Sequence, residues 1–171
     1  MGARRAEPDG RIKAFEAFHR EIGTDAARYA ATILGPRRLD LLEDVLQESW
    51  ARAWRAWDNA DPDRRVAWFF RILRNSCIDQ HRQHRPTEPL PPGLQAPGDI
   101  ENSTIARVDS DRTFALLGSL PAPLRETLWL REVRDLTYAE IAELQGVPVG
   151  TVMSRLHAAR KKASRILRSS S

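Results

Sequence analysis

The sequence holds a single cysteine, Cys77, which excludes a framework of intrachain disulfides. One thiol is typical of a reducing compartment, so we expect a cytoplasmic protein. No apolar run approaches the roughly 18 residues that a membrane-spanning helix needs. The first ten residues have no apolar stretch after their arginines, so no secretory signal is expected.

Motifs for covalent or cofactor chemistry are also missing. The sequence has no phosphate-binding loop, no Gly-x-Ser-x-Gly and no His-Glu-x-x-His. We therefore expect a protein that is not an enzyme and that holds no cofactor and no metal.

Two clusters leave a metal open as an alternative. The acidic residues Asp40, Glu43, Asp44 and Glu48 have helical spacing, as a two-metal nuclease would need, but acids near a helix start are more often solvated or docked on a basic partner. Cys77, His81 and His84 stand at i, i+4 and i+7, where zinc needs a fourth ligand from elsewhere. A buried thiol with surface histidines explains the same spacing.

Charge is spread unevenly, although the net charge is only +4. From Leu144 onward there are six basic residues and no acidic one. A basic stripe at one end of a chain favours an anionic polymer as partner, and a solvated helix face is the alternative.

A segment rich in proline and glycine divides the chain. Residues 86–99 contain five prolines and two glycines and show no helical or alternating pattern, so we expect a flexible linker over 86–104. The patterns on both sides are helical. The sequence thus predicts an all-α protein with two small helical domains, at 12–85 and 105–168.

The first domain is predicted to be a bundle. Apolar residues recur at steps of three and four from Leu42 to Trp57, and a second such helix carries Trp68, Phe69 and Ile72 inward. An earlier helix spans Phe15 to about Leu34. In the helix that carries Trp68, Phe69 and Ile72, arginines interleave with aromatics, a combination that binds single-stranded nucleic acid. Each aromatic on its own is more often part of a core.

The second domain carries a helix-turn-helix pattern. Thr137 and Glu140 form a predicted capping box, Gly146 permits a sharp turn, and Pro148 suits the start of the next helix. An ordinary helical hairpin is the alternative, but the basic second helix favours DNA binding. Its residues closest to bases or phosphates are predicted to be Thr151, Ser154, Arg155, His157, Arg160 and Lys161, of which about half would contact DNA.

Two sets of motifs resemble the sigma factors of bacterial RNA polymerase. The stretches EDVLQESWARAW at 43–54 and AWFFRILRNSCID at 67–79 resemble sigma region 2, and LPAPLRE at 120–126, LTYAEIA at 136–142 and VPVGTVMSRL at 147–156 resemble region 4. With only a linker between them, the arrangement is similar to the extracytoplasmic-function group, group 4. Met153 stands where the family often has a basic residue.

The resemblance implies a division of labour. The surface of Glu43, Asp44, Gln47 and Glu48 would bind core RNA polymerase. The −10 element would be recognised and melted by residues of the first domain, and the −35 duplex would be read by the second domain, Thr137 included. The −10 set comprises Arg64, Arg65, Trp68, Phe69, Arg71, Arg74, Asn75, Asp79 and Arg82. An anti-sigma factor is a further expected partner, membrane insertion is not expected, and a stand-alone helix-turn-helix regulator is the alternative function.

Overall fold

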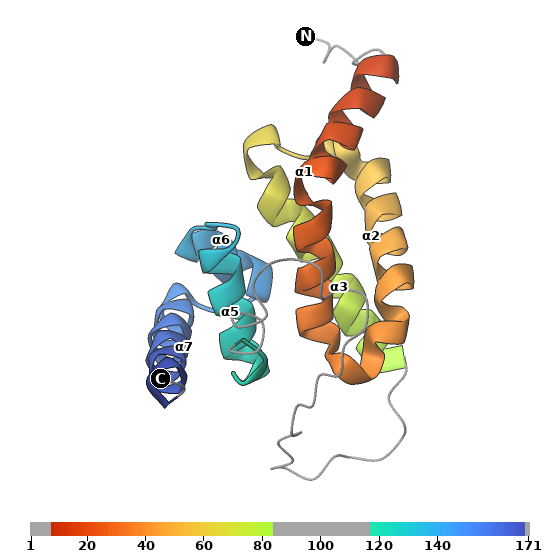
Figure 1. Cartoon of the computed structure of the whole chain (residues 1–171). Helices are drawn as coiled ribbons and strands as arrows, with labels where there is room; N and C mark the ends of the chain where they lie inside the picture. Colours follow the sequence, from red (N-terminus) through yellow and green to blue (C-terminus); the bar gives the residue numbers. More distant parts are fainter. Residues whose placement is uncertain (1–7, 84–116, 170–171) are drawn as a thin grey trace.

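A computed structural model describes residues 8–83 and 117–169 (Figure 1). Within these ranges every regular element is helical, which confirms the predicted all-α class. The predicted linker at 86–104 and His84 lie outside the described residues. The elements are, in order, α1 (Pro8–Leu34), η1 (Pro36–Leu41), α2 (Leu42–Ala56), η2 (Trp57–Asn59), η3 (Pro62–Arg64), α3 (Arg65–Gln83), α5 (Ala122–Glu132), α6 (Tyr138–Gln145) and α7 (Val149–Ser169).

The first half is a bundle of α1, α2 and α3. The first long helix begins at Pro8, earlier than the predicted Phe15, and ends as predicted before Gly35, whose φ of 72° no longer continues a right-handed helix. Between α2 and α3 the chain turns through η2 and η3, where the Asp61 side chain accepts a hydrogen bond from the Asp63 amide at 3.1 Å.

Aromatic rings fill the space between these helices. Phe69 of α3 stacks on Trp50 of α2 with ring centroids 3.9 Å apart, and Phe18 of α1 meets Phe69 edge to face at 5.9 Å. Ile22 and Phe69 are fully buried. The apolar stripes predicted from the sequence are therefore the inner faces of this bundle.

The second half contains α5, α6 and α7. The predicted capping box is present, because Thr137 accepts from the Glu140 amide and the Glu140 carboxylate accepts from the Thr137 amide. Gly146 has a φ of 67° and ends α6 in the left-handed conformation, which glycine adopts at no steric cost. The helix-turn-helix was thus correctly predicted from local signals.

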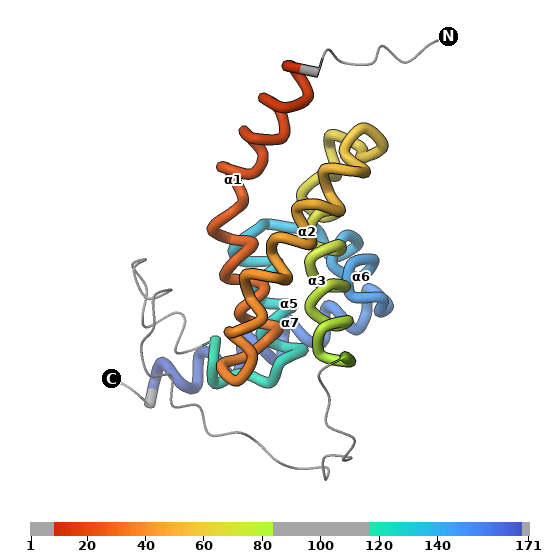
Figure 2. The backbone as a smooth tube through the Cα atoms, turned by 90° about the vertical axis from the view of Figure 1, so that its right-hand side faces the viewer, coloured from red at the N-terminus to blue at the C-terminus, as the bar shows by residue number. Residues whose placement is uncertain are grey.

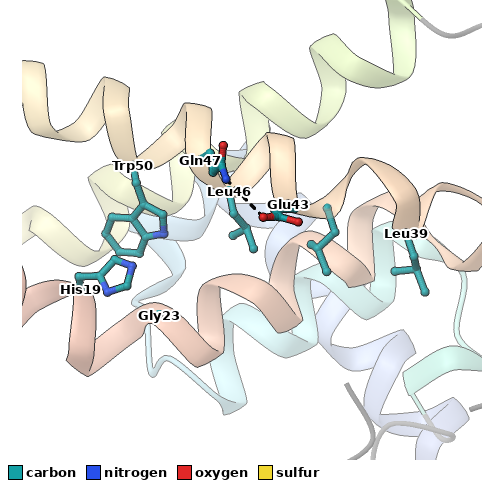
Figure 3. A pocket seen from close by; sticks show the side chains of 8 residues that line it. His19, Gly23, Leu39, Glu43, Leu46, Gln47 and Trp50 are labelled. Carbon is teal, nitrogen blue, oxygen red and sulfur yellow. Dashed lines mark hydrogen bonds between the residues drawn. The ribbon is translucent and has the colours of Figure 1, made fainter. Parts of the chain in front are cut away.

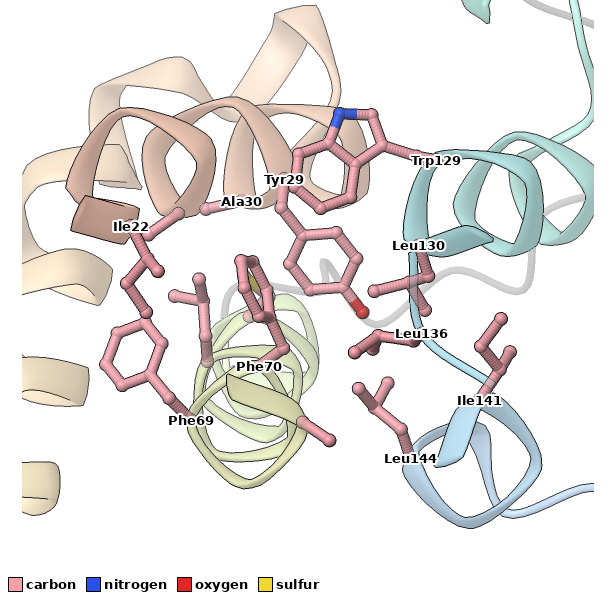
Figure 4. Close-up of a cluster of buried hydrophobic side chains, with 14 of the residues drawn as sticks. Ile22, Tyr29, Ala30, Phe69, Phe70, Trp129, Leu130, Leu136, Ile141 and Leu144 are labelled. Atoms are coloured by element: carbon pink, nitrogen blue, oxygen red, sulfur yellow. The ribbon is translucent and has the colours of Figure 1, made fainter. Parts of the chain in front are cut away.

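The two halves pack directly against each other, which the sequence had not led us to expect. Tyr29 of α1, Phe70 of α3 and Trp129 of α5 form one ring cluster, with centroid distances of 5.1 Å, 5.2 Å and 5.5 Å (Figure 4). Helices α5 and α6 lie beside α1 and α3, whereas α2 lies on the far side of the bundle (Figures 1 and 2). The hydrophobic core is continuous across the boundary between the halves.

Candidate functional site

An acidic surface occupies the start of α2. Glu43, Asp44 and Gln47 are exposed, and the Gln47 amide donates to the Glu43 carboxylate at 3.4 Å. Glu48, half-buried one turn later, forms an ion pair with Arg52. Glu43 and Asp44 lie in the first turn of α2, where the helix dipole favours negatively charged side chains. We call these four residues, Glu43, Asp44, Gln47 and Glu48, the α2 acidic surface.

A hollow of about 680 Å³ lies beside this surface, between α1 and α2 (Figure 3). Leu39, Leu46 and Trp50 supply most of its apolar wall, and Glu43 and Gln47 stand at its polar rim. The remaining lining residues are His19, Gly23 and Leu42. An apolar floor beside carboxylates suits a partner helix that carries both an apolar side chain and positive charge.

Eight of the nine predicted −10 residues lie on α3, and Arg64 ends η3 just before it. Four of the nine, Arg64, Trp68, Arg71 and Arg74, lie toward the second half of the chain. Arg64 forms an ion pair with Glu143 of α6, and Arg71 approaches the same carboxylate at 3.5 Å. Arg64, Trp68 and Arg71 also line a small hollow of about 170 Å³ together with Glu143. We call Arg64, Trp68, Arg71 and Arg74 the α3 basic face.

The fourth member of this face is held by a buried carboxylate. Glu126 of α5 is 8% exposed and accepts from Arg74 and from the Tyr29 hydroxyl, both at 2.7 Å. Burial raises the pKa of Tyr29 well above its usual value, and the charge of Glu126 adds to the rise. The phenol therefore stays protonated and continues to donate to Glu126.

One predicted −10 residue is wrongly assigned. Phe69 is 0% exposed because its ring fills the space between α1 and α2, so it cannot stack on an unpaired base. Arg65 lies with its guanidinium 4.0 Å from the centre of the Trp57 ring, a cation–π contact within the first half. Asn75 and Arg82 are exposed and Asp79 is half-buried further along α3.

The predicted −35 residues divide between two roles. Exposed side chains on α7 include Ser154, His157, Arg160 and Lys161. The Ser154 hydroxyl donates to the Thr151 carbonyl at 3.0 Å, and Arg160 pairs with Glu132 at 2.7 Å.

Arg155 and Thr137 are engaged within the domain instead. Arg155 is half-buried and donates to the side-chain amide oxygen of Gln145 at 3.1 Å, which ties α7 to the end of α6. The Thr137 hydroxyl belongs to the capping box. Thr151 is half-buried. The side chains aimed outward from α7 are thus fewer than the sequence prediction named.

The sequence reasoning missed the polar contacts between the two halves. Arg134 pairs with Asp25 at 2.7 Å, and Arg125 donates to the Thr32 carbonyl at 3.1 Å, beside the Glu126 contacts described above. No local sequence signal marks these residues, because each pair joins positions about a hundred residues apart in the chain.

Metal and nucleophile chemistry receive no support from the described residues. No group of three or more histidine, cysteine or carboxylate side chains there is arranged to hold a metal ion. Cys77 is fully buried, and burial raises the pKa of its thiol to about 12. The described helices also include none that is long and apolar enough to cross a membrane.

Two family models match the chain in the order that the motifs predicted. The model of sigma-70 region 2 matches residues 15–87, and that of sigma-70 region 4 matches residues 111–162. The first match contains the α2 acidic surface and the α3 basic face, and the second contains the helix-turn-helix.

Curated relatives match over most of the chain. The RNA polymerase sigma factor CnrH of Cupriavidus metallidurans is 31% identical over 172 aligned residues, which cover 92% of this chain and 88% of CnrH. The extracytoplasmic-function sigma factor SigW of Bacillus subtilis is 30% identical, with coverage of 74% and 75%.

Solved structures agree with the fold. CnrH in complex with the cytosolic domain of CnrY superposes with a TM-score of 0.63 at 29% identity, covering 94% of this chain and 91% of CnrH. The sigma factor RpoE of Bartonella quintana, in complex with the anti-sigma factor NepR, gives a TM-score of 0.66 at 24% identity, covering 91% of this chain and 98% of RpoE.

Proposed function

This chain belongs to the extracytoplasmic-function sigma factors of RNA polymerase, and from that membership we propose which of its residues carry each step of promoter recognition. The protein is a transcription initiation factor that binds core RNA polymerase, recognises and melts the −10 element and reads the −35 element. The observation that carries this function is the presence of regions 2 and 4, in that order, in one chain. A stand-alone regulator would need no region 2.

We propose that residues 12–85 form the domain for polymerase and the −10 element, that 86–104 is a flexible linker, and that 105–168 form the −35 domain. The region matches at 15–87 and 111–162 support this division. We also propose that the chain is a group 4 member, and the short interval between the two region matches, residues 88–110, supports this. We further propose that it acts in the cytoplasm and has no enzymatic activity of its own.

The α2 acidic surface is the proposed docking site for core polymerase. It has two exposed carboxylates, Glu43 and Asp44, and Glu43 borders the apolar hollow of Leu46 and Trp50. Helix α2 lies on the side of the bundle away from α5 and α6 (Figure 1), and Glu43, Asp44 and Gln47 are exposed when the two halves are packed. Charge and shape together suit the clamp helices of the largest polymerase subunit.

The α3 basic face is the proposed −10 surface. Arginines bind phosphates while Trp68 offers a partly exposed ring for stacking on an unpaired base. Arg65, Asn75, Asp79 and Arg82 extend the surface along the same helix. Phe69 leaves the set because its ring belongs to the core.

Helix α7 is the proposed reader of the −35 duplex. The second helix of a helix-turn-helix enters the major groove with its N-terminal residues, which places Ser154 and His157 near bases. Arg160 and Lys161, further along, suit phosphates. Arg155 contributes by fixing α7 against Gln145, and Thr137 by capping α6.

An anti-sigma factor is the remaining proposed partner. The fold is shared with RpoE, whose solved structure contains the anti-sigma factor NepR. Such a partner would compete with polymerase if it covered the α2 acidic surface. Co-purification from the native host would identify this partner.

Promoter-directed initiation gives the direct test of the function. Core RNA polymerase is mixed with the purified chain, and transcripts are mapped on genomic DNA by sequencing their 5′ ends. We expect new start sites that share −10 and −35 sequences and that core polymerase alone ignores. Tight duplex binding without polymerase, and no new start sites with it, would favour the stand-alone regulator.

Reversing one charge tests the docking surface. In Asp44→Lys we expect affinity for core polymerase to fall by about tenfold or more, because a like charge then faces a basic partner. Asp9→Lys, the same change at an exposed position near the start of α1, serves as the matched control. Equal affinity of wild type and Asp44→Lys in a fluorescence titration would remove the α2 acidic surface from the docking site.

A further inference from the structure

Helix α7 carries both buried and exposed apolar side chains. Val152, Leu156 and Ala159 are buried against α5 and α6 and hold the helix in place. Val149, in the first turn, is 43% exposed, and Met153, one turn later, is 55% exposed. In the described parts of the chain the other exposed large apolar side chains are Ile12, Val133 and Leu167. Val149 and Met153 are the pair among them that stand one turn apart.

Met153 of this pair lines a hollow with basic side chains along its length. A hollow of about 360 Å³ runs along α7, with Met153 at one end and Arg168 at the other. Tyr138 of α6 forms part of its wall, and His157 and Lys161 lie between the two ends. The surface is therefore apolar at the first turns of α7 and basic beyond them.

This combination fits a ligand that offers an apolar group close to a run of negative charge. Duplex DNA is such a ligand, because its phosphates flank a major groove in which thymine presents a C5-methyl group. No other base carries an apolar group there. Valine has no hydrogen-bonding group and the methionine sulfur is only a weak acceptor, so neither reads the donors and acceptors of the other bases.

We propose that Val149 and Met153 determine part of the −35 specificity by packing against thymine methyl groups in the major groove. This inference rests on the proposed function, in which α7 enters that groove. It assigns a role to Val149, which the sequence did not point to, and to Met153, which stands where the family often has a basic residue. It also predicts a preference for thymine opposite the first two turns of α7.

Deoxyuridine provides the test, because it pairs as thymine does and lacks only the methyl group. The −35 duplexes preferred by the holoenzyme are first selected from a random pool, and each thymine is then replaced singly by deoxyuridine. Burying one methyl group is worth about 0.8 kcal/mol, so we expect wild-type holoenzyme to bind about fourfold more weakly at one or two positions. In Met153→Ala or Val149→Ala the difference should vanish at the position that residue contacts.

Two variants separate this effect from general binding. Lys161→Ala should weaken binding to thymine and deoxyuridine duplexes by the same factor, because phosphate contacts carry no base information. Val133→Ala, an exposed apolar residue outside α7, should change neither. Both variants alter exposed side chains, so folding is expected to be preserved.

Two outcomes would overturn the proposal. One is equal affinity for thymine and deoxyuridine duplexes in wild-type holoenzyme at every position. The other is a selected −35 element without thymine on either strand. If the holoenzyme instead shows no preference for any −35 duplex over a scrambled one, the placement of α7 in the groove fails, and the proposed −35 role of α7 fails with it.

Discussion

At the scale of one residue, burial of Cys77 makes its thiol unreactive. Its thiol pKa of about 12, against an ordinary 9.0, arises mainly from burial and next from the charge of Glu126. Only the thiolate reacts with an alkylating reagent, so at pH 8 we expect iodoacetamide to modify the native protein about a thousandfold more slowly than the urea-unfolded chain. The stability that the protonated thiol contributes is present below about pH 9 and is lost as the pH rises toward 12.

Mass spectrometry of the modified peptide checks this rate. Because this is the sole cysteine, every alkylated molecule reports on the same site. A native rate within tenfold of the unfolded rate would mean that α3 opens locally around Cys77, and would revive the question of a ligand there.

Trp68 and Phe69 show how well the burial of a single residue could be predicted from the sequence. The sequence offers both as aromatic neighbours of arginines, and periodicity assigns both to an inner face. In the structure Phe69 stacks on Trp50 in the core, whereas Trp68 reaches the edge and lines the hollow facing α6. A helix turns 100° per residue, so Trp68, Phe69 and Phe70 point in three directions, and the packing of the neighbouring helices decides which rings are buried. Phe69 and Phe70 are fully buried, whereas Trp68 remains partly exposed.

At the scale of one element, the capping box of α6 gives a measurable contribution. Thr137→Ala removes the side-chain acceptor for the Glu140 amide and the hydroxyl that donates to the Glu140 carboxylate at 2.8 Å. We expect the free energy of unfolding to fall by about 1 kcal/mol, as for other N-cap losses. Urea denaturation followed by circular dichroism measures the change.

Ser154→Ala is the matched control for this measurement. Its hydroxyl also bonds to a backbone group, the Thr151 carbonyl, but from within a helix, so we expect a change below about 0.5 kcal/mol. Equal losses in the two variants would contradict a specific role of the cap.

Local signals explain why the helix-turn-helix could be predicted from the sequence, whereas the contacts of its side chains could be predicted only in part. Thr137, Glu140, Gly146 and Pro148 act over three or four residues, which sequence spacing reports directly. Arg155 depends on Gln145 across the turn, and that contact exists only once α6 and α7 are packed. The helix-turn-helix could thus be predicted, but not which of its polar groups remain free for DNA.

At the scale of the whole molecule, the contact between the two halves could not be predicted from the sequence. Tyr29, Phe70 and Trp129 each fit the apolar stripe of their own helix, and periodicity cannot distinguish a residue that packs within a domain from one that packs between two. Glu126 ends the motif at 120–126, and no local signal indicates that it is buried beside Arg74 and Tyr29. Pairs so distant in sequence leave no periodic trace.

This contact has a consequence for the proposed −10 surface. Glu143 is an internal competitor for the phosphates that Arg64 and Arg71 would bind, and Trp68 lies in the hollow they share. We therefore expect the two halves to separate at α6 when the α3 basic face binds single-stranded DNA. Both ion pairs are more than half exposed and hence weak, so removing the Glu143 charge should shift that opening modestly.

Glu143→Gln tests this competition without polymerase. We expect the free variant to bind a fluorescent single-stranded oligonucleotide of −10 sequence up to about fivefold more tightly than wild type, because Arg64 and Arg71 no longer pair with a carboxylate. Asp135→Asn makes the same carboxylate-to-amide change in an exposed pair with Arg131, within the second half, and should leave the affinity unchanged. If both variants bind equally more tightly, the effect is one of net charge. If neither does, α6 does not restrict the α3 basic face, because releasing the carboxylate would otherwise have freed two arginines for the oligonucleotide.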